Sequence, residues 1–123
     1  MAISPAFKEQ LIELLSPLGD ITIRAMFGGG GVYCDGLIFG LVINEVLYFK
    51  CDAASAGQFE AEGCGPFSYD TKDGQRSVMA YWQCPDRLYD EPDEMIEWAR
   101  TALAFSRRAA RDKAAPKTKA AVS

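Results

Sequence analysis

The 123-residue sequence predicts an α+β fold, in which an antiparallel sheet of about five strands packs in two layers against helices on one face. Two observations lead to this prediction. Short apolar segments rich in β-branched and aromatic residues are joined by turns so short that only antiparallel neighbours fit. Segments with apolar residues three and four positions apart stand before, between and after these strands. The expected element order is α-β-β-β-β-α-β-β-α.

The first helix is expected to begin at Ser4, because serine followed by Pro5 is typical of a helix N-cap and first helical position. Its apolar stripe consists of Phe7, Leu11, Leu14, Leu15 and Leu18. Pro17 and Gly19 then end the helix. Residues 21–25 alternate between apolar and polar side chains, as a strand with one face in the core does.

Two short turns define the centre of the sheet. Asp35-Gly36 is the strongest short-range hairpin signal, and Asn44-Glu45 forms a second two-residue connection. The strands that these turns join are predicted at Gly31–Cys34, Leu37–Ile43 and Val46–Cys51.

Four consecutive glycines, Gly28 to Gly31, precede these strands and give the backbone access to sharp bends and positive φ. A phosphate-binding loop would need a lysine and a hydroxyl residue leading into a helix, whereas Val32 and Tyr33 lead into a strand. We therefore interpret the glycine run as a turn or bulge.

The second half of the chain predicts a short helix, a hairpin and a long helix. Asp52 is expected to cap a helix that ends near Glu62, with Gly63 closing it. The hairpin is predicted between Phe67–Tyr69 and Ser77–Gln83.

The last helix opens at Asp90 and Pro92 and has acidic residues in its first turns, where they suit the helix dipole. Its apolar stripe fades after Ala110. We expect one domain over residues 1–110, followed by a basic, disordered tail over residues 111–123.

Charge is unevenly distributed along the chain. Through Ser106 there are 7 basic and 16 acidic residues, a net charge of −9, whereas from Arg107 onward there are 6 basic and 1 acidic residues, a net charge of +5. Basic arms can bind nucleic acid by neutralising phosphates. The other interpretation is a solvated helix end, because no aromatic side chains for base stacking are interleaved. The candidate nucleic-acid contacts are Arg107, Arg108, Arg111, Lys113, Lys117 and Lys119.

Composition argues against most catalytic chemistries. The chain has no histidine, which removes imidazole bases, Ser-His-Asp and Cys-His catalysis and His-containing metal sites. Its four cysteines are scattered without a C-x-x-C pair, so we interpret them as buried or half-buried free thiols. We predict no catalytic, cofactor-binding or metal-binding residues. No apolar run is long enough to span a membrane and the N-terminus lacks a secretory pattern, so we expect a cytoplasmic protein without membrane contact.

The sequence resembles the N-terminal domain of the TfoX/Sxy family. The resemblance runs from about Phe7 to Ala110 and is carried by MFGGGGVYCDG, LYFK, PFSY, MAYWQCPD and EWAR. It implies an antiparallel sheet backed by helices. It also implies a role in the regulation of natural competence, as a transcriptional co-regulator alongside the cyclic-AMP receptor protein. Full-length members carry a second, helical domain, in whose place this chain has the basic tail. The family has no established catalytic residues to carry over.

Aromatic residues are numerous for so small a sheet, and one sheet face must lie away from the helices. Rings on that face, with basic residues beside them, would form a partner or dimer surface. The predicted members are Arg24, Phe27, Tyr33, Tyr48, Lys50, Tyr81 and Trp82. The other interpretation is that most of the rings belong to the core. Arg24 has two candidate partners, Asp35 or an acidic ligand, and an ordinary surface salt bridge is the simpler of the two.

Three functions are compatible with these patterns. The first is a non-enzymatic regulatory domain that binds a protein partner, such as a regulator or the transcription machinery, and that dimerises through its sheet. The second is a nucleic-acid-binding accessory protein that uses its basic tail, against which the acidic body acts by repulsion. The third is a small-molecule sensor with a pocket between the sheet and the last helix.

Overall fold

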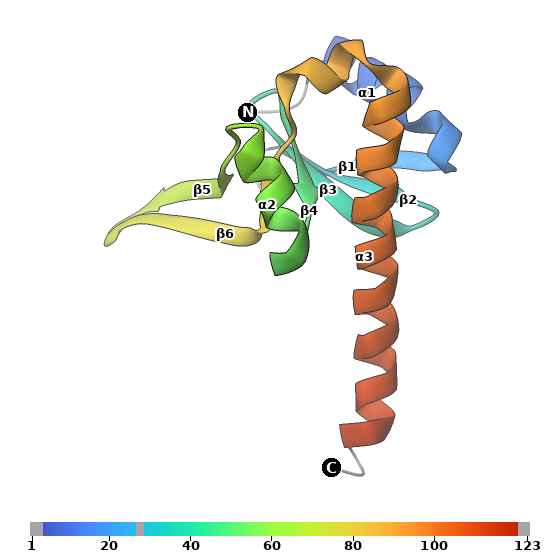
Figure 1. Ribbon diagram of the computed structural model, residues 1–123, viewed down its shortest axis with the longest axis vertical. Coiled ribbons are helices and arrows are strands. Elements are labelled where there is room, and N and C mark those ends of the chain that lie inside the picture. The colour runs from blue at the N-terminus through green and yellow to red at the C-terminus, as the bar shows by residue number, and fades with distance from the viewer. Residues whose placement is uncertain (1–3, 27–28, 121–123) are drawn as a thin grey trace.

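The computed structural model describes residues 4–26 and 29–120, which form a single antiparallel sheet with its helices on one face (Figure 1). The helices are α1 (Pro5–Leu15), α2 (Ala53–Ala61) and α3 (Pro92–Ala120), with 3₁₀ turns η1 (Ser16–Leu18) and η2 (Asp86–Asp90). The strands are β1 (Ile21–Met26), β2 (Gly29–Cys34), β3 (Leu37–Ile43), β4 (Val46–Lys50), β5 (Pro66–Thr71) and β6 (Gly74–Gln83). Their spatial order is β1-β2-β3-β4-β6-β5. The predicted α+β class and element order are confirmed, and the described strands number six instead of about five.

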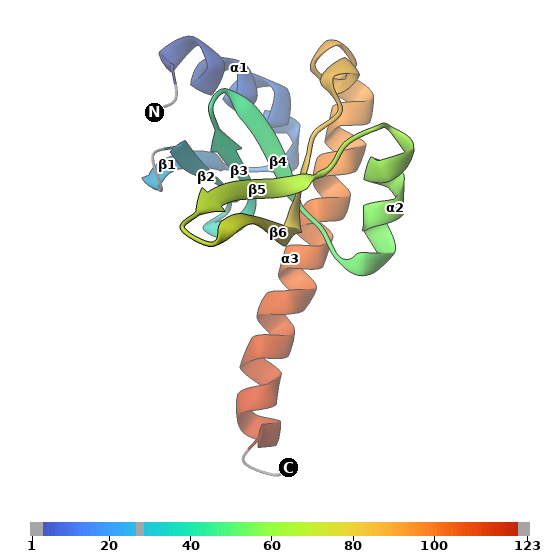
Figure 2. The ribbon, with the colours of Figure 1, turned by 90° about the vertical axis from the view of Figure 1, so that its left-hand side faces the viewer.

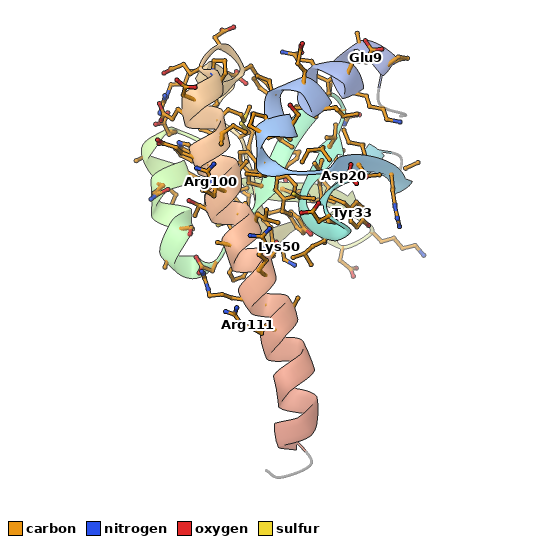
Figure 3. All side chains as sticks on the ribbon, turned by 90° about the vertical axis from the view of Figure 1, so that its right-hand side faces the viewer. Glu9, Asp20, Tyr33, Lys50, Arg100 and Arg111 are labelled. Carbon is orange, nitrogen blue, oxygen red and sulfur yellow. The ribbon has the colours of Figure 1, made fainter. Side chains whose placement is uncertain are left out.

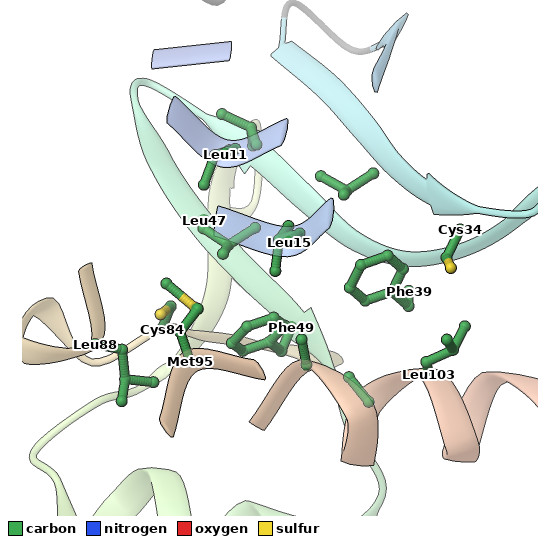
Figure 4. Close-up of a cluster of buried hydrophobic side chains, with 14 of the residues drawn as sticks. Leu11, Leu15, Cys34, Phe39, Leu47, Phe49, Cys84, Leu88, Met95 and Leu103 are labelled. Carbon is green, nitrogen blue, oxygen red and sulfur yellow. The ribbon is translucent and has the colours of Figure 1, made fainter. Parts of the chain in front are cut away.

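The core lies between one face of the sheet and the helices α1 and α3 (Figure 4). Phe39 and Phe49 project from β3 and β4 and are fully buried, as is Met95 on α3. Leu11 and Leu15, at the four-residue spacing of the predicted stripe, fill the α1 side. Each fully buried side chain of this size contributes about 1.5–3 kcal/mol of transfer free energy. The contact of α3 with β3 and β4 therefore fixes which sheet face is covered.

Both predicted hairpin turns are present. Asp35 and Gly36 have φ of 52° and 86°, and Asn44 and Glu45 have φ of 53° and 63°. Two successive positive φ values make a turn whose twist matches that of the strands it joins. Aspartate, glycine and asparagine adopt this conformation readily, whereas glutamate does not.

Glu45 also ties its turn to the start of α1. The Ser4 backbone N–H donates to Glu45 Oε2 at 3.1 Å, and the Ser4 hydroxyl donates to Glu45 Oε1 at 2.5 Å. The same hydroxyl accepts from the Phe7 N–H at 3.2 Å, so Ser4 is the N-cap that the sequence predicts.

Gly29, Gly30 and Gly31 are the first residues of β2 and do not form the predicted turn or bulge, whereas Gly28 lies outside the described residues. All three pair with β1, and Gly30 and Gly31 also pair with β3. Close backbone packing explains the glycine at this end of the strand, because a Cβ on Gly29 would overlap the Val42 carbonyl oxygen. The register irregularity lies further on, between Val32 and Tyr33.

The last helix extends beyond the end of its apolar stripe. Ser106 is the last buried side chain that the structure describes on α3, yet the helical backbone continues to Ala120, past the sheet (Figure 1). The sequence predicted a disordered tail from residue 111 onward. Alanine, lysine and arginine, which dominate this segment, have high helix propensity, and this accounts for the longer helix. The domain boundary at residue 110 stays a prediction.

Arg87 joins three carboxylates at the start of α3. It contacts Glu62 at 2.8 Å, Glu91 at 3.2 Å and Glu94 at 2.6 Å. Hydrogen bonds from Arg87 and then Trp98 lower the pKa of Glu94 to about 2 from an ordinary value of 4.5. Bonds from Arg87 likewise lower the pKa of Glu62. The network links the residue after α2 to η2 and α3.

The turn at Glu45 predicts an unusual order of stabilities. Glu45→Ala removes the bonds to Ser4 and keeps the left-handed backbone, whereas Glu45→Gly removes the same bonds and relieves the backbone. We expect the free energy of unfolding of the alanine variant, measured by urea denaturation, to be about 1 kcal/mol lower than that of the glycine variant. A glycine variant equal to or less stable than the alanine variant would contradict a strained turn.

The Arg87 network predicts acid sensitivity. Because the pKa of Glu94 is lower in the folded state, its ion pair stabilises the fold above about pH 4.5 and this contribution is lost as the pH falls towards about 2. In thermal melts, Arg87→Gln should lower Tm at neutral pH and flatten the decline of Tm over this acidic range. Arg100→Gln, which removes an exposed charge from the same helix, is the control. Equal acid sensitivity of Arg87→Gln and the wild type would exclude the network as the cause.

Candidate interaction surface

None of the described helices packs on the second face of the sheet, and we call this face the open face (Figure 1). Figure 2 views the molecule with the sheet in front of α3. Alternation places Phe49 and Trp82 on the helix side, so their neighbours Tyr48 and Tyr81 belong to the open face. The register of β1 to β4 and β6 extends this face to Thr22, Arg24, Tyr33, Ile38, Leu41, Tyr48, Lys50, Tyr81 and Gln83.

Aromatic side chains of the open face interact with one another across the sheet. Tyr33 and Tyr81 belong to β2 and β6, with β3 and β4 between them in the sheet, yet Tyr33 is close enough for its charge to affect Tyr81. Burial is the main cause that raises the pKa of Tyr81, and the Tyr33 phenolate raises it further. The ring of Tyr48 meets that of Phe67 edge-on, with centroids 5.1 Å apart. Burial also raises the pKa of Tyr48.

Arg24 stacks on this aromatic cluster. Its guanidinium carbon lies 5.1 Å from the centroid of the Tyr33 ring, within the range of a cation–π contact. The structure describes both Arg24 and Asp35, and no ion pair joins them. Asp35 instead accepts from the Asp20 N–H at 3.2 Å. The Arg24 side chain is exposed, so its charge faces solvent above the sheet.

Two members of the predicted surface do not belong to the described open face. Trp82 was assigned wrongly: it is only 3% exposed and packs on the helix side, where its ring centroid is 6.2 Å from that of Phe59 on α2. The predicted surface placed Tyr81 and Trp82 together although adjacent strand residues point to opposite faces. Phe27 lies outside the described residues.

Lys50 is half-buried at the end of β4. Its register partner is Tyr81, which places it on the open face, and it also borders a small cavity beside α2. Figure 3 labels Lys50 together with Tyr33. The structure therefore keeps five predicted residues on one face: Arg24, Tyr33, Tyr48, Lys50 and Tyr81.

Leu41 and Phe67 are members of the cluster that the predicted surface omitted. Leu41 lies opposite Tyr48, and the two-residue turn at Asn44-Glu45 dictates this pairing. Pairing the residues of the two strands outward from this turn therefore predicts that Leu41 lies opposite Tyr48. Phe67 reaches Tyr48 because of an irregularity in the pairing of β5 with β6, for which the sequence has no clear signal.

The basic residues of the predicted nucleic-acid surface belong to α3, and Figure 3 shows Arg111 on the part of this helix that continues away from the sheet. Arg107, Arg108 and Arg111 are exposed. Arg108 Nη2 is 3.5 Å from Asp52 Oδ2, and its guanidinium carbon is 5.8 Å from the Phe105 ring centroid. The side chains of the other three predicted contacts lie outside the described residues: Lys113, Lys117 and Lys119.

The cavity between β4, α2 and α3 is small. It is bordered by Cys51, Phe59 and Trp98 and has a volume of about 10 Å³, the room that one water molecule needs. This cavity is too small for the metabolite that the sensor hypothesis requires.

The cysteines are free thiols, with Cys64 half-buried and the other three buried. Burial raises the pKa of Cys51 to about 11 and also raises the pKa of Cys34, Cys64 and Cys84, so these thiols stay protonated at neutral pH. Within the described ranges, no three metal-binding side chains cluster. None of the described helices has the length and apolar content required to cross a membrane.

Residues 13–106 match the TfoX N-terminal domain, which is more than half of the chain. The chain is also similar to the DNA transformation protein TfoX1 of Aliivibrio fischeri (strain ATCC 700601 / ES114). The two are 25% identical over 100 residues, which cover 81% of this chain and 47% of the relative. The chain thus spans about half the length of this curated relative.

The proximity of Tyr33 and Tyr81 predicts coupled titration. Tyr33→Phe removes a phenolate and should lower the pKa of Tyr81, while burial keeps that pKa above its ordinary value of 10.0. The measurement is an NMR titration of ¹³C-labelled tyrosine. Tyr48→Phe, on the same face, is the control and should leave the Tyr81 pKa unchanged. An unchanged Tyr81 pKa in Tyr33→Phe would contradict the proximity of the two phenols.

Proposed function

This chain belongs to the TfoX N-terminal domain family, and from that premise we propose that it is a non-enzymatic regulatory domain that acts by binding a protein partner. The partner is a regulator or a component of the transcription machinery. The name of the DNA transformation protein TfoX1 supports transformation by DNA as the regulated process.

The observation that carries this proposal is the open face. Its aromatic rings are half-buried and clustered, with an exposed arginine stacked above them. Tyrosine and arginine are the residues most enriched at the energetic centres of protein interfaces, since both combine large contact area with hydrogen-bond donors. The open face has both residue types on a rigid sheet. It is the surface best suited to recognise another protein.

A second candidate function is nucleic-acid binding through the end of α3. Arg107 and Arg111 are exposed where the helix continues past the sheet (Figure 1), and this favours contact with phosphates. The net charge of −9 through Ser106 opposes it, because the body repels a polyanion. Arg108 also forms a salt bridge with Asp52. We rank this function second.

Complementation of a gene deletion tests the proposal. We expect deletion to change the transcript levels of genes for DNA uptake and to change transformation frequency. The wild-type chain should restore both, whereas Arg24→Glu should not. Arg100→Glu, which makes the same charge change on the exposed side of α3, should restore both. Thermal melts of the purified variants verify that each is folded.

Two outcomes would contradict protein binding through the open face. One is full restoration by Arg24→Glu. The other is a defect confined to the double variant Arg107→Glu/Arg111→Glu, which would favour the nucleic-acid function instead. A deletion that leaves every transcript unchanged would refute the regulatory proposal itself.

A further inference from the structure

The four strands β1 to β4 contain no aspartate or glutamate. Their only charged residues are Arg24 and Lys50, both cationic, and the register places both on the open face. The same chain has a net charge of −9 through Ser106. The carboxylates of the body lie elsewhere, in the helices, the turns and the β5–β6 hairpin. The centre of the open face is therefore a cationic and aromatic area on an acidic domain.

From this charge distribution, and building on the function proposed above, we infer that the open face binds an acidic segment of its protein partner through carboxylate side chains. Arg24 is the central residue of this interaction. Its guanidinium presents several N–H donors in a planar fork that matches a carboxylate, and stacking on Tyr33 holds that plane over the sheet.

The tyrosines supply further donors for the same groups. A phenol that stays protonated donates its O–H to a carboxylate oxygen. Burial raises the pKa of both Tyr48 and Tyr81, so both remain donors throughout the physiological range. Their half-buried rings, together with that of Phe67, provide the apolar contact that the residues between the carboxylates of the segment would cover.

Charge complementarity distinguishes this occupant from two others. A second copy packed face to face would bring Arg24 and Lys50 towards cations of the same kind, which is unfavourable. A nucleic acid offers anions, but it extends far enough to meet the acidic body as well. A short acidic segment meets only the open face.

Peptide selectivity tests this inference. The probes are three fluorescein-labelled degenerate pools, each of about eight residues, enough to cross four strands spaced roughly 4.8 Å apart. All pools have Val, Ile, Phe or Tyr at alternate positions. The positions between them are Asp/Glu in the first pool, Asn/Gln in the second and Lys/Arg in the third. Fluorescence anisotropy with the full chain should show the acidic pool binding at least about tenfold more tightly than the amide pool, and the basic pool binding least.

Variants locate the binding on the open face. Arg24→Gln should remove most of the preference for the acidic pool over the amide pool. Tyr81→Phe keeps the ring and should weaken binding of the acidic pool alone by a few-fold. Arg100→Gln removes an exposed cation elsewhere on the surface and should leave the preference intact. Near-ultraviolet circular dichroism verifies the fold of each variant.

The inference is overturned if the amide pool binds as tightly as the acidic pool, or if no pool binds. It is also overturned if Arg100→Gln weakens binding as much as Arg24→Gln, because general attraction would then be the cause. Dimerisation of the free chain in sedimentation experiments, abolished by Arg24→Gln, would instead assign the face to a second copy. The complementation experiment separates this inference from the proposed function. If gene regulation still depends on Arg24 in any of these cases, the proposed function holds and the partner has a different chemistry.

Discussion

The packing of α3 on β3 and β4 is the constraint on which the rest of the structure depends. Phe39 and Phe49 are buried on one side of the sheet, against the part of the helix that contains Met95 and Leu103 (Figure 4). Because strand residues alternate, this contact also fixes which residues point the other way. Tyr48 and Lys50 reach the open face because Phe49, between them, is in the core. The interaction surface and the hydrophobic core are thus set by the same alternation.

Most of the fold could be predicted from the sequence because its local signals agree with its tertiary contacts. Ser4 before Pro5, Asp35 before Gly36 and Asp52 before α2 each begin or end an element where the pattern indicates. The errors arise where local preference and tertiary packing differ. Gly29 looks like part of a turn, but the backbone of Val42 comes so close that only glycine fits in the strand. The length of α3 was missed because its Ala- and Lys-rich segment has no apolar periodicity to follow.

Part of the candidate surface could also be predicted from the sequence. Arg24, Tyr33, Tyr48 and Tyr81 follow from alternation along single strands. The same alternation excludes Trp82, because it is adjacent to Tyr81 and therefore points to the helix side. The interaction of Tyr33 with Tyr81 across two intervening strands depends on the arrangement of four strands, which no local pattern encodes. The cationic character of the open face, in contrast, follows directly from the composition of β1 to β4.

The side-chain charges of α3 are sorted along its length. Asp93, Glu94 and Glu97 occupy its first turns, and Arg107 and Arg111 stand further along, so that opposite charges are separated by roughly 15 to 27 Å at 1.5 Å per residue. Asp93 and Glu94 complement the positive partial charge of the backbone in the first turn. The acidic first turns and the later arginines together give the molecule an electric moment along the helix. The electric field of a strongly charged molecule exerts a torque on this moment during diffusion. The protein is therefore rotated before contact, so that the C-terminal part of α3 points towards negative charge and its first turns point away.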